Sequence, residues 1–165
     1  MSCADWKLKP PSAYKGAVIA SIVAKDSRFK LKTHSKYGLS CFNGDEEKGT
    51  IDLELDTQDF QKLQEVESWV RQEVFESPFS DHKKGKDFHS SFKDETLKAK
   101  VLLGKVCVWS PDGSKLSTDD LYGRDLSLEV VVQPKRVYFM GKLYGIVWEA
   151  TDILAHPKEV VCPFI

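Results

Sequence analysis

One segment with a helical period interrupts a chain whose other apolar runs have the character of strands. Over residues 56–78, DTQDFQKLQEVESWVRQEVFESP, hydrophobic side chains recur at steps of three and four residues, which places them on one stripe of a helix. The stripe consists of Phe60, Leu63, Val66, Val70 and Val74. Asp56 or Thr57 can cap the N-terminus of this helix, and Pro78 ends it. Its other faces are acidic, so we expect a packing element that repels phosphate.

The remaining periodic segments predict strands, because they are β-branched runs or alternate between apolar and polar residues. They cover residues 16–24, 27–33, 50–56, 96–109 and 126–132, followed by two hairpin arms within 136–154. Strands and helices do not alternate, which argues against a parallel α/β sheet. The expected fold is therefore mainly β with one inserted helix, a five-stranded, OB-fold-like (oligonucleotide-binding) Greek-key barrel. A jelly roll or another α+β sheet is the alternative.

Chain length and the lack of long apolar runs predict a single domain outside the membrane. A chain of 165 residues, 41% hydrophobic, can bury one core but is short for two domains. We expect one domain over residues 1–165, with an N-terminal tail at about 1–15, a mobile basic loop at about 79–95 and a C-terminal tail at about 155–165. The charged N-terminus lacks the apolar core of a signal peptide, so an intracellular protein without a membrane partner is expected.

The sequence contains no recognisable catalytic set. HExxH, GxSxG, Walker A and GxGxxG patterns are absent, and the four histidines have no paired spacing. Four cysteines lie far apart without CxxC spacing, which predicts reduced thiols and not a zinc site or disulfide frame: Cys3, Cys41, Cys107 and Cys162. We expect no enzyme activity, no metal and no cofactor, although a site assembled from scattered residues stays open.

The charge of the chain is segregated although its net value is only −1. Residues 1–50 carry nine basic and five acidic side chains, and residues 82–100 carry six and three. Residues 51–81, by contrast, carry two basic and nine acidic side chains. Such a distribution can leave a cationic face on a nearly neutral protein, or it can reflect side chains of both signs that are only solvated.

Three segments interleave basic residues with rings, at residues 28–37, 83–93 and 135–144. Proteins that bind single strands combine cationic grooves with aromatic platforms for the bases. In the third segment, alternation places Arg136 and Tyr138 on one face and Lys135 and Phe139 on the other. Phe139, Ile146 and Trp148 are expected in the core. The alternative interpretation is that all the rings are core and the lysines serve only solubility.

The order of segments resembles the single-stranded DNA-binding proteins of podovirus-type phages and the related replication proteins of large DNA viruses. The resemblance rests on GTIDLELDTQDFQKLQEVESWV, KVCVWSPDGSKLSTDDLYGRDLSLEVVVQPKRVYF and LYGIVWEATDIL, and it covers about residues 16–154. It implies an OB-fold and a DNA groove. The site residues expected are Lys30, Lys32, Lys105, Lys135, Arg136, Tyr138, Lys142 and Tyr144. The chain departs from the family at its end, HPKEVVCPFI, which lacks a long acidic tail.

The resulting hypothesis is sequence-independent binding of single-stranded DNA in viral DNA replication, recombination or repair. RNA, replication proteins and a second copy of the chain are further candidate partners, and a viral protein would act in the host cytoplasm or nucleus. A hypothesis from another class is a protein-interaction or virion structural module on the same small barrel. That module would bind no oligonucleotide and would expose an apolar patch.

Overall fold

Two long strands, β11 (Leu126–Met140) and β12 (Leu143–Pro157), form an antiparallel hairpin around which the sheet is built. The computed structural model describes residues 3–41 and 47–157. Gly141 and Lys142 form the two-residue turn of the hairpin, and Gly141 has a φ of +60°, which glycine adopts without a Cβ clash. The register shifts on both sides of Pro134, because a proline cannot donate a hydrogen bond to the neighbouring strand.

Ten shorter strands complete a sheet of twelve strands over the described residues. They are β1 (Lys7–Leu8), β2 (Ser12–Tyr14), β3 (Ala17–Val23), β4 (Phe29–Ser35), β5 (Leu39–Cys41), β6 (Lys48–Glu54), β7 (Asp87–His89), β8 (Phe92–Lys93), β9 (Thr96–Leu102) and β10 (Cys107–Trp109). The fold is mainly β, as predicted, but the number of strands exceeds the expected five. The additional strands are mostly two or three residues long, too short to show alternation in the sequence.

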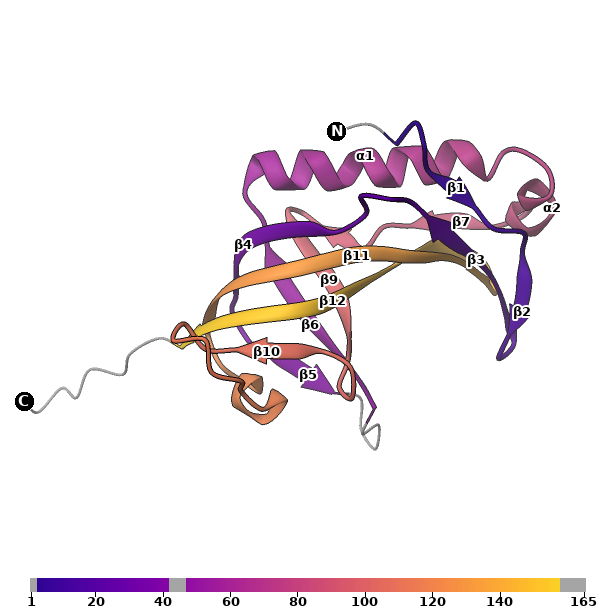
Figure 1. Ribbon diagram of the computed structural model, residues 1–165. Coiled ribbons are helices and arrows are strands. Elements are labelled where there is room, and N and C mark those ends of the chain that lie inside the picture. Colours follow the sequence, from indigo (N-terminus) through magenta and orange to yellow (C-terminus); the bar gives the residue numbers. More distant parts are fainter. Residues whose placement is uncertain (1–2, 42–46, 158–165) are drawn as a thin grey trace, which may run out of the picture.

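The strand pairings form a path that returns to its start. Neighbouring strands follow the order β1, β3, β11, β4, β6, β9, β12, β10, and β11 also pairs with β12. The path from β11 through β4, β6 and β9 to β12 therefore leads back to β11. Its narrowest connections are single pairings, His34 with Glu54 and Lys100 with Glu149. Figure 1 shows β11 and β12 curving past β6 and β9.

The predicted helix is α1 (Thr57–Glu73), and it lies along one side of the curved sheet (Figure 1). Asp56 caps it by accepting a hydrogen bond of 2.7 Å from the backbone N–H of Asp59. Its buried residues include Leu63, Val66 and Val70 from the predicted stripe. A second, short helix, α2 (Phe79–Lys83), and a 3-10 turn, η1 (Thr118–Leu121), are further helical elements. Within the described residues, neither α-helix has the length and apolar character needed to span a bilayer.

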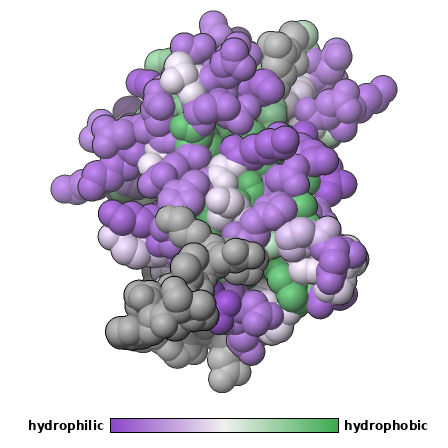
Figure 2. Space-filling model, turned by 90° about the vertical axis from the view of Figure 1, so that its left-hand side faces the viewer, coloured by the Kyte–Doolittle hydropathy of each residue, from purple (hydrophilic) through white to green (hydrophobic). Residues whose placement is uncertain are grey.

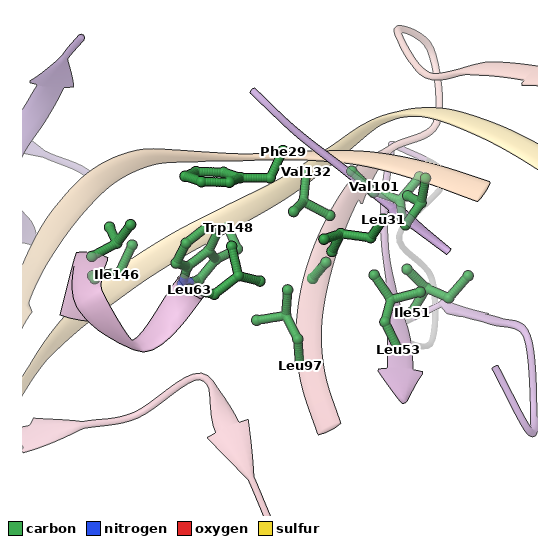
Figure 3. Packing of buried hydrophobic residues seen from close by; sticks show 14 of the residues in the cluster. Phe29, Leu31, Ile51, Leu53, Leu63, Leu97, Val101, Val132, Ile146 and Trp148 are labelled. Atoms are coloured by element: carbon green, nitrogen blue, oxygen red, sulfur yellow. The ribbon is translucent and has the colours of Figure 1, made fainter. Parts of the chain in front are cut away.

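The core fills the space between α1 and the concave side of the sheet. Figure 3 shows Leu63 of α1 beside Trp148, with Leu97 and Leu31 next to them and Ile51 and Leu53 beyond. Phe139, Ile146 and Trp148 are buried, which confirms that they belong to the core. Each fully buried side chain of this size contributes roughly 1.5–3 kcal/mol relative to exposure, so this cluster is a main source of stability.

Several expected boundaries differ in the structure. The expected tail at residues 1–15 includes β1 and β2, and Trp6 is buried beside Trp69 with ring centroids 5.6 Å apart. The expected mobile loop at 79–95 contains α2, β7 and β8. The expected strand at 96–109 is divided by a turn in which the N–H of Lys105 donates to the carbonyl of Leu102.

The short strands of these segments are ordered by pairing with longer strands: β2 pairs with β3, β8 with β9, and β7 with β12. At the other end of the chain, β12 continues through residues 155–157. The rest of the expected C-terminal tail, with Cys162, lies outside the described residues.

Candidate nucleic-acid interface

A groove opens on the outer face of the sheet where β9 and β12 separate. The two strands share one pairing, between Lys100 and Glu149. Away from this pairing the segment 89–94 lies between them, and all three segments border a hollow of about 930 Å³, which we call the seam groove. The buried core residues Ile146 and Trp148 border it from β12. The groove is large enough for part of a nucleic-acid chain, because pockets for small ligands measure roughly 300–1,000 Å³.

A buried carboxyl of α1 fixes one wall of the seam groove. The Ser90 hydroxyl donates to Glu67 Oε1 over 2.8 Å, and the Ser91 N–H donates to Glu67 Oε2 over 3.2 Å. The Ser91 hydroxyl in turn donates to the carbonyl of Ile146 over 2.9 Å. Burial raises the pKa of Glu67, while the hydrogen bonds from Ser90 and Ser91 act in the opposite direction. The wall is therefore attached both to the helix and to β12.

The seam groove has a cationic lining. Lys93, Lys98 and Lys100 face Asp52 and Asp94. Burial lowers the pKa of Lys100, and the positive charges of Lys48 and Arg136 lower it further. Tyr14 and Glu149 act in the opposite direction. A phosphate placed beside Lys100 would further offset the repulsion from Lys48 and Arg136.

Tyr138 lies across the glycine opposite it on β12. Tyr138 and Gly145 are cross-strand partners, and a Cβ on Gly145 would stand 2.8 Å from the Tyr138 hydroxyl and 2.6 Å from the His89 carbonyl oxygen. Only glycine leaves room for the ring and the β7 backbone together. Tyr138 is partly exposed and lines the seam groove, and burial raises its pKa. Its position therefore suits stacking against a base.

Tyr144 does not offer its ring to solvent, in contrast to the sequence prediction. Its exposure is 3%, and its ring stacks on Phe139 with centroids 6.0 Å apart and an interplanar angle of 16°. The ring of Phe88 also packs against Tyr144, with centroids 5.3 Å apart. Phe139 and Tyr144 are directly opposite each other in the hairpin, and opposite residues of an antiparallel pair point to the same face. Tyr144 therefore belongs to the core.

The other predicted basic residues lie at different places around the sheet. Arg136 is adjacent to the seam groove, with its guanidinium 5.8 Å from the ring centroid of Tyr14. Lys135 forms an ion pair of 3.4 Å with Glu149, beside the same groove. Lys142 is exposed at the turn between β11 and β12, and Lys105 is exposed beyond the end of β9.

Lys30 and Lys32 are exposed, but they are not brought to the seam groove. They pair with Val131 and Glu129 in the first half of β11, whereas Arg136 and Tyr138 lie in its second half. Lys30 borders a separate small hollow that also contains Trp109 and Asp152.

Lys98, Lys100 and Tyr14 are neighbours of the site that sequence reasoning did not select. Lys98 and Lys100 alternate with the buried residues Leu97, Ala99 and Val101, so their outward direction was readable from the sequence. The proximity of Lys100 to Arg136 was not readable, because it depends on the pairing of β9 with β12. Nothing in the sequence marked Tyr14 as a site residue except its position before the Lys15-Gly16 turn.

The side of the molecule shown in Figure 2 is mainly hydrophilic, and its visible hydrophobic residues form small separate patches. Exposed large hydrophobic side chains occur on several elements, for example Tyr37 in the β4–β5 turn and Phe75 after α1. The Lys83 ammonium covers the Phe75 ring at 3.6 Å from its centroid. On this side the described residues do not present the broad apolar face expected of an interaction module.

The described part of the chain contains no cluster of three or more His, Cys, Asp or Glu side chains arranged to hold a metal ion. Cys3, Cys41 and Cys107 are free thiols.

Comparison with known proteins identifies a shared fold but no close relative. No family model matches the sequence, and no curated protein matches it significantly. Among solved structures, the single-stranded DNA-binding protein from bacteriophage Enc34 matches with a TM-score of 0.56 and 14% identity, covering 93% of this chain and 92% of that chain. Its C-terminally truncated form matches with a TM-score of 0.54 and 14% identity, covering 94% and 98%. The chain thus shares the overall fold of a phage single-stranded DNA-binding protein.

Proposed function

We propose that this protein binds single-stranded DNA in the seam groove, without sequence preference and without catalysis. Bases stack on Tyr138, and phosphates are neutralised by Lys98, Lys100 and Arg136. The observation that carries the proposal is the position of Lys100, a partly buried cation held near Lys48 and Arg136 and next to a partly exposed ring. The shared fold with a phage single-stranded DNA-binding protein supports it.

Within this proposal the closed path of β11, β4, β6, β9 and β12 is a five-stranded OB-type barrel, and the other strands are additions to it. Such barrels bind oligonucleotides across the outer face of their strands. A role in viral replication, recombination or repair follows from the resemblance to viral proteins, and it places the protein inside the host cell. The predicted contributions of Lys30, Lys32, Lys105, Lys135 and Lys142 to DNA binding stay predictions.

The proposal is tested by titrating a fluorescent oligo-dT into the protein and following anisotropy at several salt concentrations. If Lys98, Lys100 and Arg136 each neutralise one phosphate, log K falls with log salt with a slope of about −2, since each contact contributes about −0.7 on a single strand. Absence of binding at low salt would refute the proposal.

Variants of Tyr138 separate a stacking role from a structural one. Tyr138→Ala removes the platform and is expected to weaken binding by about 1–3 kcal/mol, or about 5- to 150-fold. Tyr138→Phe keeps the ring and retains the affinity. Tyr37→Ala is the matched control, because Tyr37 is 65% exposed and lies in the β4–β5 turn. Equal affinity of Tyr138→Ala and wild type, with both proteins folded, would remove Tyr138 from the site.

A further inference from the structure

Two hairpin turns meet at the end of the sheet where β11 finishes. The β2–β3 turn consists of Lys15 and Gly16, and the β11–β12 turn consists of Gly141 and Lys142. Because β3 runs antiparallel to β11, with Val18 opposite Phe139, the start of β3 lies beside the end of β11. Figure 1 shows β2, β3, α2 and β7 gathered at this end, opposite the C-terminus.

A second hollow, of about 610 Å³, lies among these elements, and we call it the tip pocket. Lys15, Lys84 and Lys86 line it, together with His82 and one acidic residue, Asp81. Three ammonium groups against a single carboxylate give the tip pocket a positive potential. Residues of strands β2 and β11 also line the tip pocket, so it is formed by several elements at the end of the sheet and not by a single loop.

Backbone contacts fix the shape of the tip pocket. The Lys86 ammonium donates to the carbonyl of Gly141, and the N–H of Asp87 donates to the carbonyl of Lys142 over 2.9 Å. Both bonds tie the segment after α2 to the β11–β12 turn. The lysines of the tip pocket therefore project from anchored backbone, which lowers the entropy cost of presenting them to a ligand.

The tip pocket lies next to the seam groove. Tyr14, which lines the tip pocket, is close enough to Lys100, which lines the seam groove, to interact with it electrostatically. Along the segment 86–89, which ends in β7, His89 borders the seam groove and Lys86 the tip pocket, a separation of about 10 Å for three extended residues. Tyr14 of the tip pocket lies under the guanidinium of Arg136, which is adjacent to the seam groove.

We propose that the tip pocket is a second phosphate-binding subsite, which holds the continuation of the single strand that occupies the seam groove. The inference rests on the proposed function and extends it to a longer track. Lys15 and Lys84 contact phosphates, while Tyr14, which is 43% exposed, is the ring available at the junction. Contacts of this kind add affinity without reading sequence.

The test uses a double variant, Lys15→Asn with Lys84→Gln. Both substitutions are chosen so that the fold should not change. Lys15 has a φ of 44° and precedes Gly16, and Asn-Gly is a preferred pair for such two-residue turns. Lys84 is exposed. The control is Lys36→Gln, an exposed lysine after β4, because β4 ends opposite the start of β11 and thus at the other end of the sheet.

Salt-dependent anisotropy titrations are run with oligo-dT of about 4 and about 16 nucleotides, the range of site sizes for one OB fold. The wild type is expected to show a steeper salt slope with the longer oligonucleotide. The double variant lowers that slope by about 1.4, at about 0.7 per lysine, and leaves the short oligonucleotide unaffected. The Lys36→Gln variant behaves as the wild type with both lengths.

The outcomes distinguish this inference from the proposed function. Binding of both lengths with equal salt slopes in the wild type and the double variant overturns the tip pocket subsite and leaves the seam groove intact. Failure of the wild type to bind either oligonucleotide overturns the proposed function and the inference with it. If the double variant changes the salt slope only for the longer oligonucleotide, the result supports continuation of the strand from the seam groove into the tip pocket.

Discussion

Replacing Gly145 by alanine tests the close packing of Tyr138 in the seam groove. The new Cβ would stand 2.6 Å from the His89 carbonyl oxygen, 2.8 Å from the Tyr138 hydroxyl and 3.0 Å from Tyr138 Cζ. The first contact is with backbone, so β7 has to move or β12 has to bend. Overpacking of this kind costs about 1–3 kcal/mol of unfolding free energy. For a chain of this length that corresponds to a fall in Tm of about 3–9 °C.

The assay combines thermal unfolding with oligo-dT anisotropy. Gly104→Ala is the matched control, because a Cβ at Gly104 meets nothing within 4 Å, and this variant should melt at or slightly above the wild-type temperature. Gly145→Ala should also bind oligo-dT more weakly, since the displaced Tyr138 and His89 both line the seam groove. Adding Tyr138→Phe removes the hydroxyl contact but not the His89 contact, so it should restore part of the lost Tm.

The reasoning is refuted if Gly145→Ala melts within about 1 °C of Gly104→Ala, a difference that corresponds to well under 1 kcal/mol. The packing would then have room to adjust, and Tyr138 would not be held in place by Gly145. Normal melting combined with weakened binding would also contradict it, because displacement of the ring is expected to be the cause of both effects.

Two further predictions concern titratable side chains. Hydrogen bonds to Glu54 and then to Asp125 raise the pKa of His34, so its contribution to stability is complete below about pH 6.5 and is lost as pH rises through the folded-state pKa. The Tm of the wild type should therefore exceed that of His34→Gln most at acidic pH, and this difference should shrink as the pH becomes alkaline. At acidic pH it should be no more than about 3 °C, because the interactions of His34 with Glu54 and Asp125 are close to solvent. A difference that grows with pH would contradict this. For Glu67, the alanine variant leaves the Ser90 hydroxyl and Ser91 N–H without their acceptor and should cost about 1–3 kcal/mol, measured by denaturant unfolding. Glu67→Gln keeps an acceptor oxygen and should cost less; equal losses would show that the hydrogen bonds do not matter.

The sequence was sufficient for features that depend on local periodicity. The stripe from Phe60 to Val74 and the capping Asp56 predicted α1, because a helix satisfies its backbone hydrogen bonds within one segment. Alternation likewise separated Arg136 and Tyr138 from Phe139 within one strand. Tyr144 was wrongly expected at the DNA site, because the face of the sheet to which its side chain points depends on the register of the hairpin. A two-residue turn at Gly141 and Lys142 places Phe139 opposite Tyr144, so the turn length contained the information.

Only the tertiary structure created the candidate site. The seam groove exists because β9 and β12, about fifty residues apart in the chain, share a single pairing at Lys100 and Glu149 and then separate. The same arrangement brings Lys100 near Arg136 and leaves Lys30 in a different part of the sheet. Periodicity fixes the face on which a side chain lies, but long-range strand pairing decides its neighbours. The positive potential of a groove depends on those neighbours.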